Sequence, residues 1–442
     1  MALLPGPLLL AVLSASAHVH RVVRPRCPAV QCGATADYLV RLGCTEEQAS
    51  KAEGKLLPQV RSRLDAAAVE GTSSALRSRL SMSDEELRKV LFTMPQMLAL
   101  SFDNNISPKL DALQSGLALS DAQLRKVVVA QPPVLGYSFK SNIAPSVDAL
   151  QSELKLSEAQ MRKVVVSQPG VLGLSITSNI GPKLNALQSR LALSDEELRK
   201  VVVGLPQVLS YSFESNMAPK LDGLQSRLAL SDAQLRKVVV LLPPVLGLSL
   251  HSNIFPKLDA LQSRLALSDA ELQRMVVARP QTLSLSFESN VAPSLDALQS
   301  RLALSDEELR KVLLTLPSVL GLSFETNVSP SLDALQSRLA LSDAQLKRVV
   351  LLLPTVLGYS FESNISPKLD YLQSALALPL DALRDRVVRF PPLLGYSHTQ
   401  RFQPRIDACH AAGVDATIVL SRITMTDARF YAALDGSGRG AE

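Results

Sequence analysis

The chain contains no tryptophan, and aromatic residues make up only 4% of its 442 residues. Proteins that bind single-stranded nucleic acid normally stack the bases on exposed aromatic rings. The scarcity of rings therefore argues against such a groove. Leu, Val and Ala dominate instead, as is typical of helices packed through aliphatic side chains. Four of the tyrosines cluster at one kind of short turn, where we expect them to pack: Tyr137, Tyr211, Tyr359 and Tyr396.

Cysteine and histidine are also scarce, which leaves little basis for metal binding or catalysis. The four cysteines (Cys27, Cys32, Cys44, Cys409) form no ladder of pairs and no zinc-type spacing with histidine. The five histidines share no common position, and no glycine-rich phosphate loop is present. We therefore expect no metal, no cofactor and no enzymatic activity.

Excess charge is small as well. Lys and Arg number 46 and Asp and Glu 41, and residues 1–36 hold three of the bases and no acid. The remainder is close to neutral, so total charge alone does not argue for nucleic acid. No later apolar segment reaches membrane-spanning length without charge or proline, and we expect no membrane association.

The sequence repeats with a fixed period of 37 residues along most of its length. The period is marked by one proline per repeat and, thirteen residues later, by a second proline. The first set is Pro58, Pro95, Pro132, Pro169, Pro206, Pro243, Pro280, Pro317, Pro354 and Pro391, and the second is Pro108, Pro145, Pro182, Pro219, Pro256, Pro293, Pro330, Pro367 and Pro404. A constant period of this length is the signature of stacked structural repeats. The sequence predicts an all-α fold in which 37-residue helical repeats stack in register into a curved superhelical solenoid.

Each repeat opens with a helix start signal. Ser194 is an N-cap, and Glu197 completes a capping box with it. Leu198, Val201, Val202 and Leu205 then follow at helical spacing, and proline ends the helix. The same Ser with Glu or Gln recurs at Ser83/Glu86, Ser120/Gln123, Ser231/Gln234, Ser268/Glu271, Ser305/Glu308 and Ser342/Gln345.

The second half of each repeat predicts a short helical turn followed by another helix. In the same repeat the second helix is expected to begin near 215–219, with Asn216 as its cap and Pro219 in its first turn. Its apolar face would be Met217, Leu221, Leu224 and Leu228. Neither helix can bury its apolar face alone, so neighbouring repeats must share one core.

The two ends differ from the repeats. We divide the chain into a leader (1–36), a degenerate N-terminal capping repeat (37–82), the regular repeats (83–404), and a C-terminal cap with a flexible tail (405–442). Within the leader, 1–17 is typical of a signal peptide and the acid-free, basic 18–36 of a transit peptide. Together they favour a plastid over a mitochondrion, and either over simple secretion.

The repeat resembles that of the mTERF (mitochondrial transcription termination factor) family. The likeness lies in a helix ending in Pro-x-Val/Leu-Leu, a short turn, then x-Pro-Lys-Leu-x-x-Leu before Leu-Ser-Asp-Glu-Glu-Leu. It covers 37 to about 432, including the closing stretch from Ile423 to Phe430, which we expect to be helical. The resemblance implies an organellar, monomeric protein whose basic concave surface holds double-stranded DNA in transcription termination or initiation. Some plastid members act on RNA, in splicing or ribosomal RNA maturation.

Two rows of cations are the candidate nucleic-acid-binding residues. The first-helix row stands six residues before the first proline, opposite the apolar stripe at about 100° per residue, and suits a phosphate backbone. It comprises Lys89, Lys126, Lys163, Lys200, Lys237, Arg274, Lys311 and Arg348. The post-proline row follows the second proline and comprises Lys109, Lys183, Lys220, Lys257, Lys368 and Arg405.

Two further rows accompany them. The adjacent row lies one residue before the first-helix row, at Arg88, Arg125, Arg162, Arg199, Arg236, Arg310 and Lys347, with Gln273 as the exception. The second-helix arginine row is Arg190, Arg227, Arg264, Arg301 and Arg338.

Other interpretations of these cations stay open. Long cations spaced at four residues from acids, such as Glu196 and Lys200, are often only a solvated helix face. A near-neutral solenoid with acids at Glu214, Glu288, Glu325 and Glu362 could also be a scaffold that binds protein partners. Base-specific recognition is not indicated, because the variable position before the first proline is mostly apolar.

Overall fold

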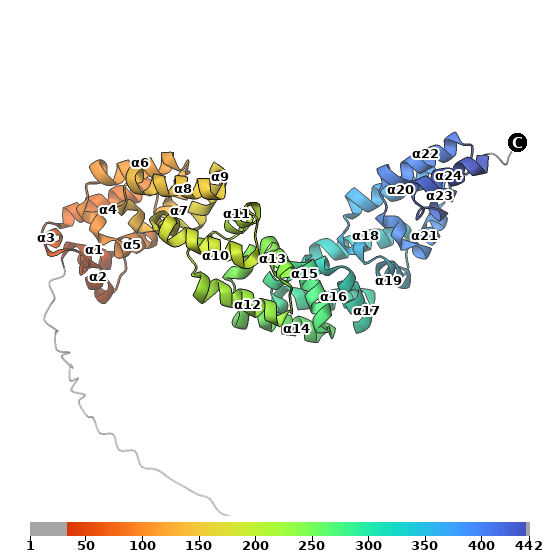
Figure 1. The fold of residues 1–442 in the computed structure, drawn as a ribbon, viewed down its shortest axis with the longest axis horizontal. Coiled ribbons are helices and arrows are strands. Elements are labelled where there is room, and N and C mark those ends of the chain that lie inside the picture. The colour runs from red at the N-terminus through yellow and green to blue at the C-terminus, as the bar shows by residue number, and fades with distance from the viewer. Residues whose placement is uncertain (1–32, 439–442) are drawn as a thin grey trace, which may run out of the picture. The chain divides into compact units, whose positions relative to one another are not determined.

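The computed structural model describes residues 33–438, and within them the chain is helical, with no strand. It divides into two compact units, Met1–Ser138 and Phe139–Glu442, which we describe separately. The all-α repeat fold predicted from the 37-residue period is confirmed in both. Figure 1 shows the succession of helices along the chain.

The first helix of each repeat begins where the capping box predicts. In α11 the Ser194 hydroxyl accepts a hydrogen bond from the Glu197 amide, and the Glu197 carboxylate accepts one from the Ser194 amide. All the predicted capping boxes are present, and Ser157 with Gln160 adds another. The first helices are α5 (Asp84–Thr93) and α7 (Asp121–Ala130) in the first unit, and α9 (Glu158–Ser167), α11 (Asp195–Gly204), α13 (Asp232–Leu241), α15 (Asp269–Ala278), α17 (Asp306–Thr315), α19 (Asp343–Leu352) and α21 (Leu380–Arg389) in the second.

Proline ends each first helix and starts a short 3-10 turn. The missing amide hydrogen of Pro206 would leave a helical bond unmade, so the chain turns at Leu205 and re-enters a tighter helix. The turns are η1 (Pro95–Ala99), η3 (Pro132–Gly136), η5 (Pro169–Gly173), η7 (Pro206–Leu209), η9 (Pro243–Gly247), η11 (Pro280–Ser284), η13 (Pro317–Gly321), η15 (Pro354–Gly358) and η17 (Pro391–Gly395).

A π-helical turn, which the sequence did not predict, leads into each second helix. In this turn the Ser212 hydroxyl accepts from the Ser215 amide, so Ser212 is the cap where Asn216 was expected. The π turns are η2 (Phe102–Ile106), η4 (Phe139–Ile143), η6 (Ile176–Ile180), η8 (Phe213–Met217), η10 (Leu250–Ile254), η12 (Phe287–Val291), η14 (Phe324–Val328), η16 (Phe361–Ile365) and η18 (His398–Phe402).

Each second helix has proline at its second position, where no amide donor is needed. Its last carbonyls are capped by a residue with positive φ, as at Ala192 (φ 48°). The second helices are α6 (Ser107–Gly116), α8 (Ala144–Leu154), α10 (Gly181–Leu191), α12 (Ala218–Arg227), α14 (Phe255–Leu265), α16 (Ala292–Leu302), α18 (Ser329–Leu339), α20 (Ser366–Ala375) and α22 (Gln403–Ala411).

Like elements of successive repeats pack on each other. Within the second unit α11 contacts α13, η7 contacts η9, and α10 contacts the π turn η8 of the next repeat. The predicted apolar faces form the shared core: Leu198, Val201, Val202 and Leu205 are buried, and so are Met217, Leu221, Leu224 and Leu228. The core is thus a continuous layer of Leu and Val between helices, as expected for a solenoid.

The N-terminal end, where we expected a degenerate repeat, has four helices in place of the regular pattern. Thr45 and Gln48 form a capping box, and Leu76 and Leu80 are buried. Its helices are α1 (Ala34–Arg41), α2 (Glu46–Glu53), α3 (Pro58–Arg61) and α4 (Ala66–Leu80). The predicted leader, apart from the start of α1, lies outside the described residues.

The C-terminal end differs from the prediction in two respects. The chain forms α23 (Ile418–Ser421) and α24 (Asp427–Gly438), but Ile423 lies in the loop between them and not in the final helix. The carbonyls of this loop accept hydrogen bonds from arginine side chains instead of helical amides. The helix α24 also extends into the predicted tail. None of the described helices combines the length and apolarity required to cross a membrane.

Candidate nucleic-acid interface

The first-helix row is exposed to solvent along its whole length. It lies on the side of each first helix opposite the buried leucines and valines, as predicted from helical geometry. The first unit carries Lys89 and Lys126, and the second carries the other members at consecutive repeats. Within the described residues only two members have a polar partner: the Lys200 ammonium lies 2.9 Å from the Glu196 carboxylate, and Arg348 donates to the Val388 carbonyl at 3.1 Å.

Members of the adjacent row, one residue earlier, bond to preceding parts of the stack, either to a capping glutamate of the first helix before or to a backbone carbonyl. The guanidinium of Arg310 lies 2.6 Å from the carboxylate of Glu271, and the Lys347 ammonium lies 2.7 Å from Glu308. These acids are the capping-box partners of the neighbouring helix. The hydrogen bonds from Arg310 and from the Ser268 amide lower the pKa of Glu271 to about 2. This row therefore braces the stack and compensates the capping acids.

The second-helix arginine row makes a second, more regular brace. Arg264 donates to Asp296 and Gln299 of the next repeat, both at 2.7 Å, and lies 3.6 Å from Asp306 at the start of a first helix. The amide of Gln299 also donates to Asp306, at 2.8 Å. The same contacts to the acid and amide of the next repeat recur for Arg79, Arg190, Arg227, Arg301 and Arg338.

The post-proline row is also engaged within the protein. Lys220 is half-buried and donates to the Leu246 carbonyl of the next repeat at 2.7 Å and to Asn216 at 3.0 Å. Burial lowers the pKa of Lys220. Lys109 makes the same carbonyl contact with Leu135 at 2.7 Å. Lys183 and Lys257 donate to the asparagine four residues earlier, and Lys368 makes both contacts.

These contacts explain how a nearly neutral array can present a positive surface. The aspartates at first-helix starts face the second-helix arginines, and the capping glutamates face the adjacent row. Many of the acids at the repeat junctions are thus paired with cations of these two rows. The first-helix row, apart from Lys200 and Arg348, keeps its charge without a partner among the described residues.

The repeat pattern, the helix–turn–helix geometry and the cation rows can now be compared with known proteins. The sequence profile of the mTERF family matches residues 74–267 and 261–431. The chain belongs to the mTERF family. Proteins of this family are organellar helical-repeat proteins that bind nucleic acid. No curated protein matches the chain in sequence.

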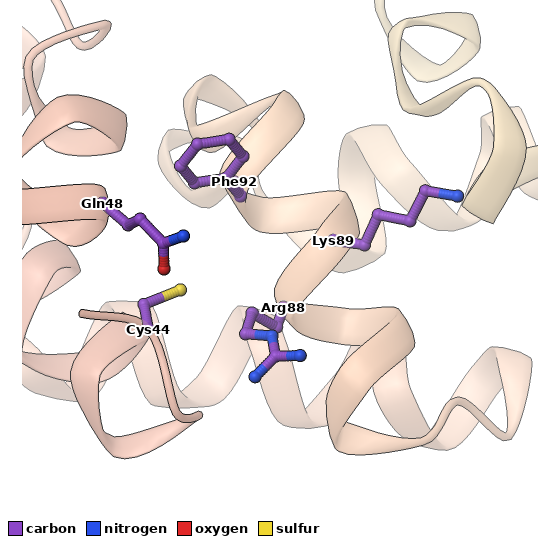
Figure 2. Close-up of a pocket in the computed structure, with 5 residues that line it drawn as sticks. All are labelled: Cys44, Gln48, Arg88, Lys89 and Phe92. Atoms are coloured by element: carbon purple, nitrogen blue, oxygen red, sulfur yellow. The ribbon is translucent and has the colours of Figure 1, made fainter.

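The first mTERF repeat of the first unit carries a cavity beside the first-helix row. It has a volume of about 380 Å³ and is lined by Cys44, Gln48, Arg88, Lys89 and Phe92. Gln48 and Cys44 face Arg88 and Phe92 across it, while Lys89 extends away along the other side of α5 (Figure 2). Burial raises the pKa of the Cys44 thiol, so it is a poor nucleophile.

The tyrosines at the 3-10 turns of the mTERF repeats are half-buried. The Lys220 ammonium lies 5.5 Å from the ring centre of Tyr211, and Lys368 lies 5.9 Å from that of Tyr359. These rings therefore cover the post-proline lysines. Among the described residues no group of three or more His, Cys, Asp or Glu is placed to hold a metal ion.

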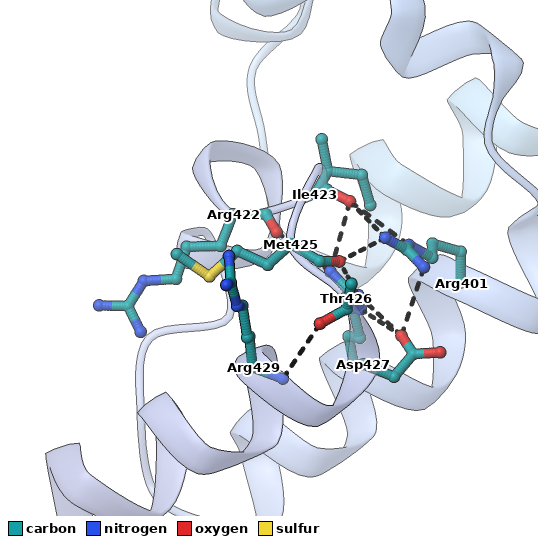
Figure 3. A network of polar contacts seen from close by, with 8 residues as sticks. Arg401, Arg422, Ile423, Met425, Thr426, Asp427 and Arg429 are labelled. Carbon is teal, nitrogen blue, oxygen red and sulfur yellow. Dashed lines mark hydrogen bonds and ion pairs between the residues drawn. The ribbon is translucent and has the colours of Figure 1, made fainter.

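The last mTERF repeat ends in an arginine network that sequence reasoning missed (Figure 3). Arg405 is 1% exposed and donates to the Arg422 carbonyl at 3.1 Å, the Met425 carbonyl at 2.6 Å and the Asp427 carboxylate at 2.7 Å. The hydrogen bond from Arg405 lowers the pKa of Asp427. Arg405 occupies the post-proline position, so the C-terminal loop supplies the carbonyls that the next repeat supplies elsewhere. The only sequence signal was arginine in place of lysine at this position.

Proposed function

We propose that this protein binds double-stranded DNA in an organelle through the phosphates along its first-helix row. The observation that carries the proposal is the distribution of partners: the other three rows are engaged inside the stack, whereas most of the first-helix row is exposed and uncompensated. Cations at regular intervals along stacked repeats suit a polymer of phosphates better than a compact ligand.

The surroundings of the row favour recognition of the backbone over recognition of bases. One helical turn beyond each cation stand small or aliphatic residues, such as Gly204, Leu241, Ala278 and Thr315. These side chains offer few hydrogen bonds to base edges. The half-buried tyrosines offer no stacking platform for a single strand. A duplex held by its phosphates fits these properties best.

Within an organelle, a duplex-binding protein of this family would act in transcription termination or initiation. The signal-like segment 1–17 followed by the basic segment 18–36 supports a plastid. The lysines at 183, 220, 257 and 368 are bonded within the repeat junctions and hold neighbouring elements together. The side chains that contact the duplex phosphates are those of the first-helix row.

The test is a salt series of binding to labelled duplex DNA and to single-stranded RNA. If the six cations of the second unit each engage a phosphate, the logarithm of duplex affinity should fall with the logarithm of salt with a slope of about −5. Tighter binding to RNA would assign the protein to splicing or ribosomal RNA maturation. No binding to either at low salt would contradict the proposal and favour a scaffold for protein partners, using exposed acids such as Glu325 and Glu362.

A further inference from the structure

A second polar cavity lies at the last junction between repeats in the second unit. It has a volume of about 340 Å³ and is formed where the end of η16 and the start of α20 meet η17 and η18. Ligand pockets in proteins start at about 300 Å³, so the space can hold a small polar group. Its polar lining includes Ser363, Asn364, Lys368, Ser397, His398 and Thr399.

Lys368 is the most deeply buried lysine of the post-proline row, with 5% of its surface exposed. Its ammonium donates to the Leu394 carbonyl and, at 3.2 Å, to the Asn364 side chain. No carboxylate lies within ion-pair distance of it among the described residues, and its pKa is lowered by burial alone. A lysine has three donors. Among the described residues the third donor has no hydrogen-bond acceptor, and the charge meets only two neutral acceptors and the Tyr359 ring at 5.9 Å, which is costly for a buried cation.

The lining of this cavity departs from the other repeats in the direction that would favour an anion. His398 stands where the equivalent residues are Phe, Leu or Ile, as at Phe287, Leu250 and Ile176. Thr399 stands where four repeats have an exposed glutamate: Glu214, Glu288, Glu325 and Glu362. The imidazole of His398 lies against Tyr371, with ring centres 4.2 Å apart, which fixes the ring beside the cavity. An acid is thus replaced by a hydroxyl, and an apolar ring by a hydrogen-bonding one.

We propose that this cavity is a phosphate-binding site, in which Lys368 supplies the charge and the hydroxyls and imidazole of the lining supply hydrogen bonds. Charge-assisted hydrogen bonds to phosphate oxygens are among the strongest in proteins. The phosphate group can belong to a free anion or to a nucleic-acid strand. The site is separate from the first-helix row and does not depend on duplex binding through that row.

Calorimetric titration of the full chain with inorganic phosphate, in a buffer free of other oxyanions, tests the site directly. Chloride at matched ionic strength serves as the control. We expect saturable binding with one site, weakened about tenfold or more by Lys368→Met. The double substitution His398→Phe with Thr399→Glu gives this junction the residues found at Phe287 and Glu288. It should weaken phosphate binding as much as Lys368→Met does, without removing a buried charge.

Lys220→Met is the matched control, because Lys220 makes the same two backbone and asparagine contacts at a junction that has Leu250 in place of His398. It should leave phosphate binding unchanged. If duplex DNA displaces the bound phosphate, the site binds a phosphate group of a nucleic-acid strand. If DNA and phosphate bind together, the site binds a free anion. Absence of saturable binding, or equal binding by the double variant, would overturn the proposal even if duplex binding is normal.

Discussion

The exposed face of the first helices and the junctions of the second helices carry the same kind of residue at the same period, yet they use it differently. Lys237 on α13 is exposed and has no partner among the described residues, whereas Lys220 and Arg227 on α12 are held by the next repeat. The difference is the supply of acceptors. A second helix faces the carbonyls, aspartates and glutamines of its neighbour, whereas the outer face of a first helix is mostly exposed to water, with Arg348 as the one row member that reaches the next repeat among the described residues.

The comparison teaches that a periodic row of cations is not by itself a binding surface. Four rows repeat every 37 residues, and three of them bond to the next or the preceding repeat. The net charge of the chain is therefore a poor guide to its surface. What matters is which charges the stack leaves uncompensated.

The largest expected effect comes from removing charge from the first-helix row. Substituting Lys200, Lys237, Arg274 and Lys311 together by Gln should weaken duplex binding on the order of a thousandfold at 0.1 M salt and flatten the salt slope by about 3 to 4 units. Fluorescence anisotropy across a salt series measures both. The fold should be unaffected, because these side chains are exposed.

The control for this variant keeps the charge and changes only the side chain. Exchanging the three lysines for Arg and Arg274 for Lys should preserve the affinity within a few-fold, since phosphates are bound mainly by charge. Equal duplex affinity of the Gln variant and the wild type would show that the row does not contact DNA.

The next largest effect concerns the C-terminal member of the post-proline row. Arg405→Met should lower the free energy of unfolding by roughly 3 kcal/mol, because it leaves loop carbonyls without their buried donor. Thermal or denaturant unfolding measures the loss. The matched substitution Arg274→Met, in the exposed first-helix row, should change stability little, and an equal loss there would contradict the distinction between the rows.

A smaller loss is expected at an ordinary junction. Arg264→Ala removes bonds to Asp296 and Gln299 and should reduce the free energy of unfolding by about 1–2 kcal/mol. Lys237→Ala, on the exposed face of the first helix of the same repeat, is the control and should fall within about 0.5 kcal/mol of the wild type. Equal destabilisation by both variants would contradict the assignment of the arginine row as a brace.

The smallest effect is a pH dependence from the adjacent row. Arg310 and the Ser268 amide hold the pKa of Glu271 at about 2, below its unfolded value of 4.5. A carboxyl with a lowered folded pKa stabilises the protein above its unfolded pKa, and that stability is lost as pH falls from about 4.5 to 2. Arg310→Ala should therefore flatten the decline of the unfolding midpoint in this window. An unchanged acid limb would show that the pair contributes nothing.

Much of the fold follows from the sequence because its signals are local. Ser194 with Glu197 marks a helix start, and Pro206 marks its end, through contacts within a few residues. The π turn before α12 was missed because Ser212 and Asn216 are both good caps, and the choice between them depends on packing against the preceding repeat.

The candidate site was predictable only in part. The sequence places Lys200 opposite Leu198, and the structure confirms that this face is exposed. The sequence alone does not reveal that Lys220 donates to the Leu246 carbonyl or that Arg264 donates to Asp296. These partners become neighbours only when the repeats stack. The difference between a free and an engaged cation is a property of the stack.

Lysine acetylation footprinting with and without duplex DNA tests the central claim most directly, because it compares the lysines of the first-helix row with those of the post-proline row. In the free protein, Lys163, Lys237 and Lys311 should react quickly and Lys220 and Lys368 slowly, since the latter are buried and bonded. Duplex DNA should protect the first group and leave Lys220 unchanged. Protection confined to the second group, or no protection of the first, would contradict the account.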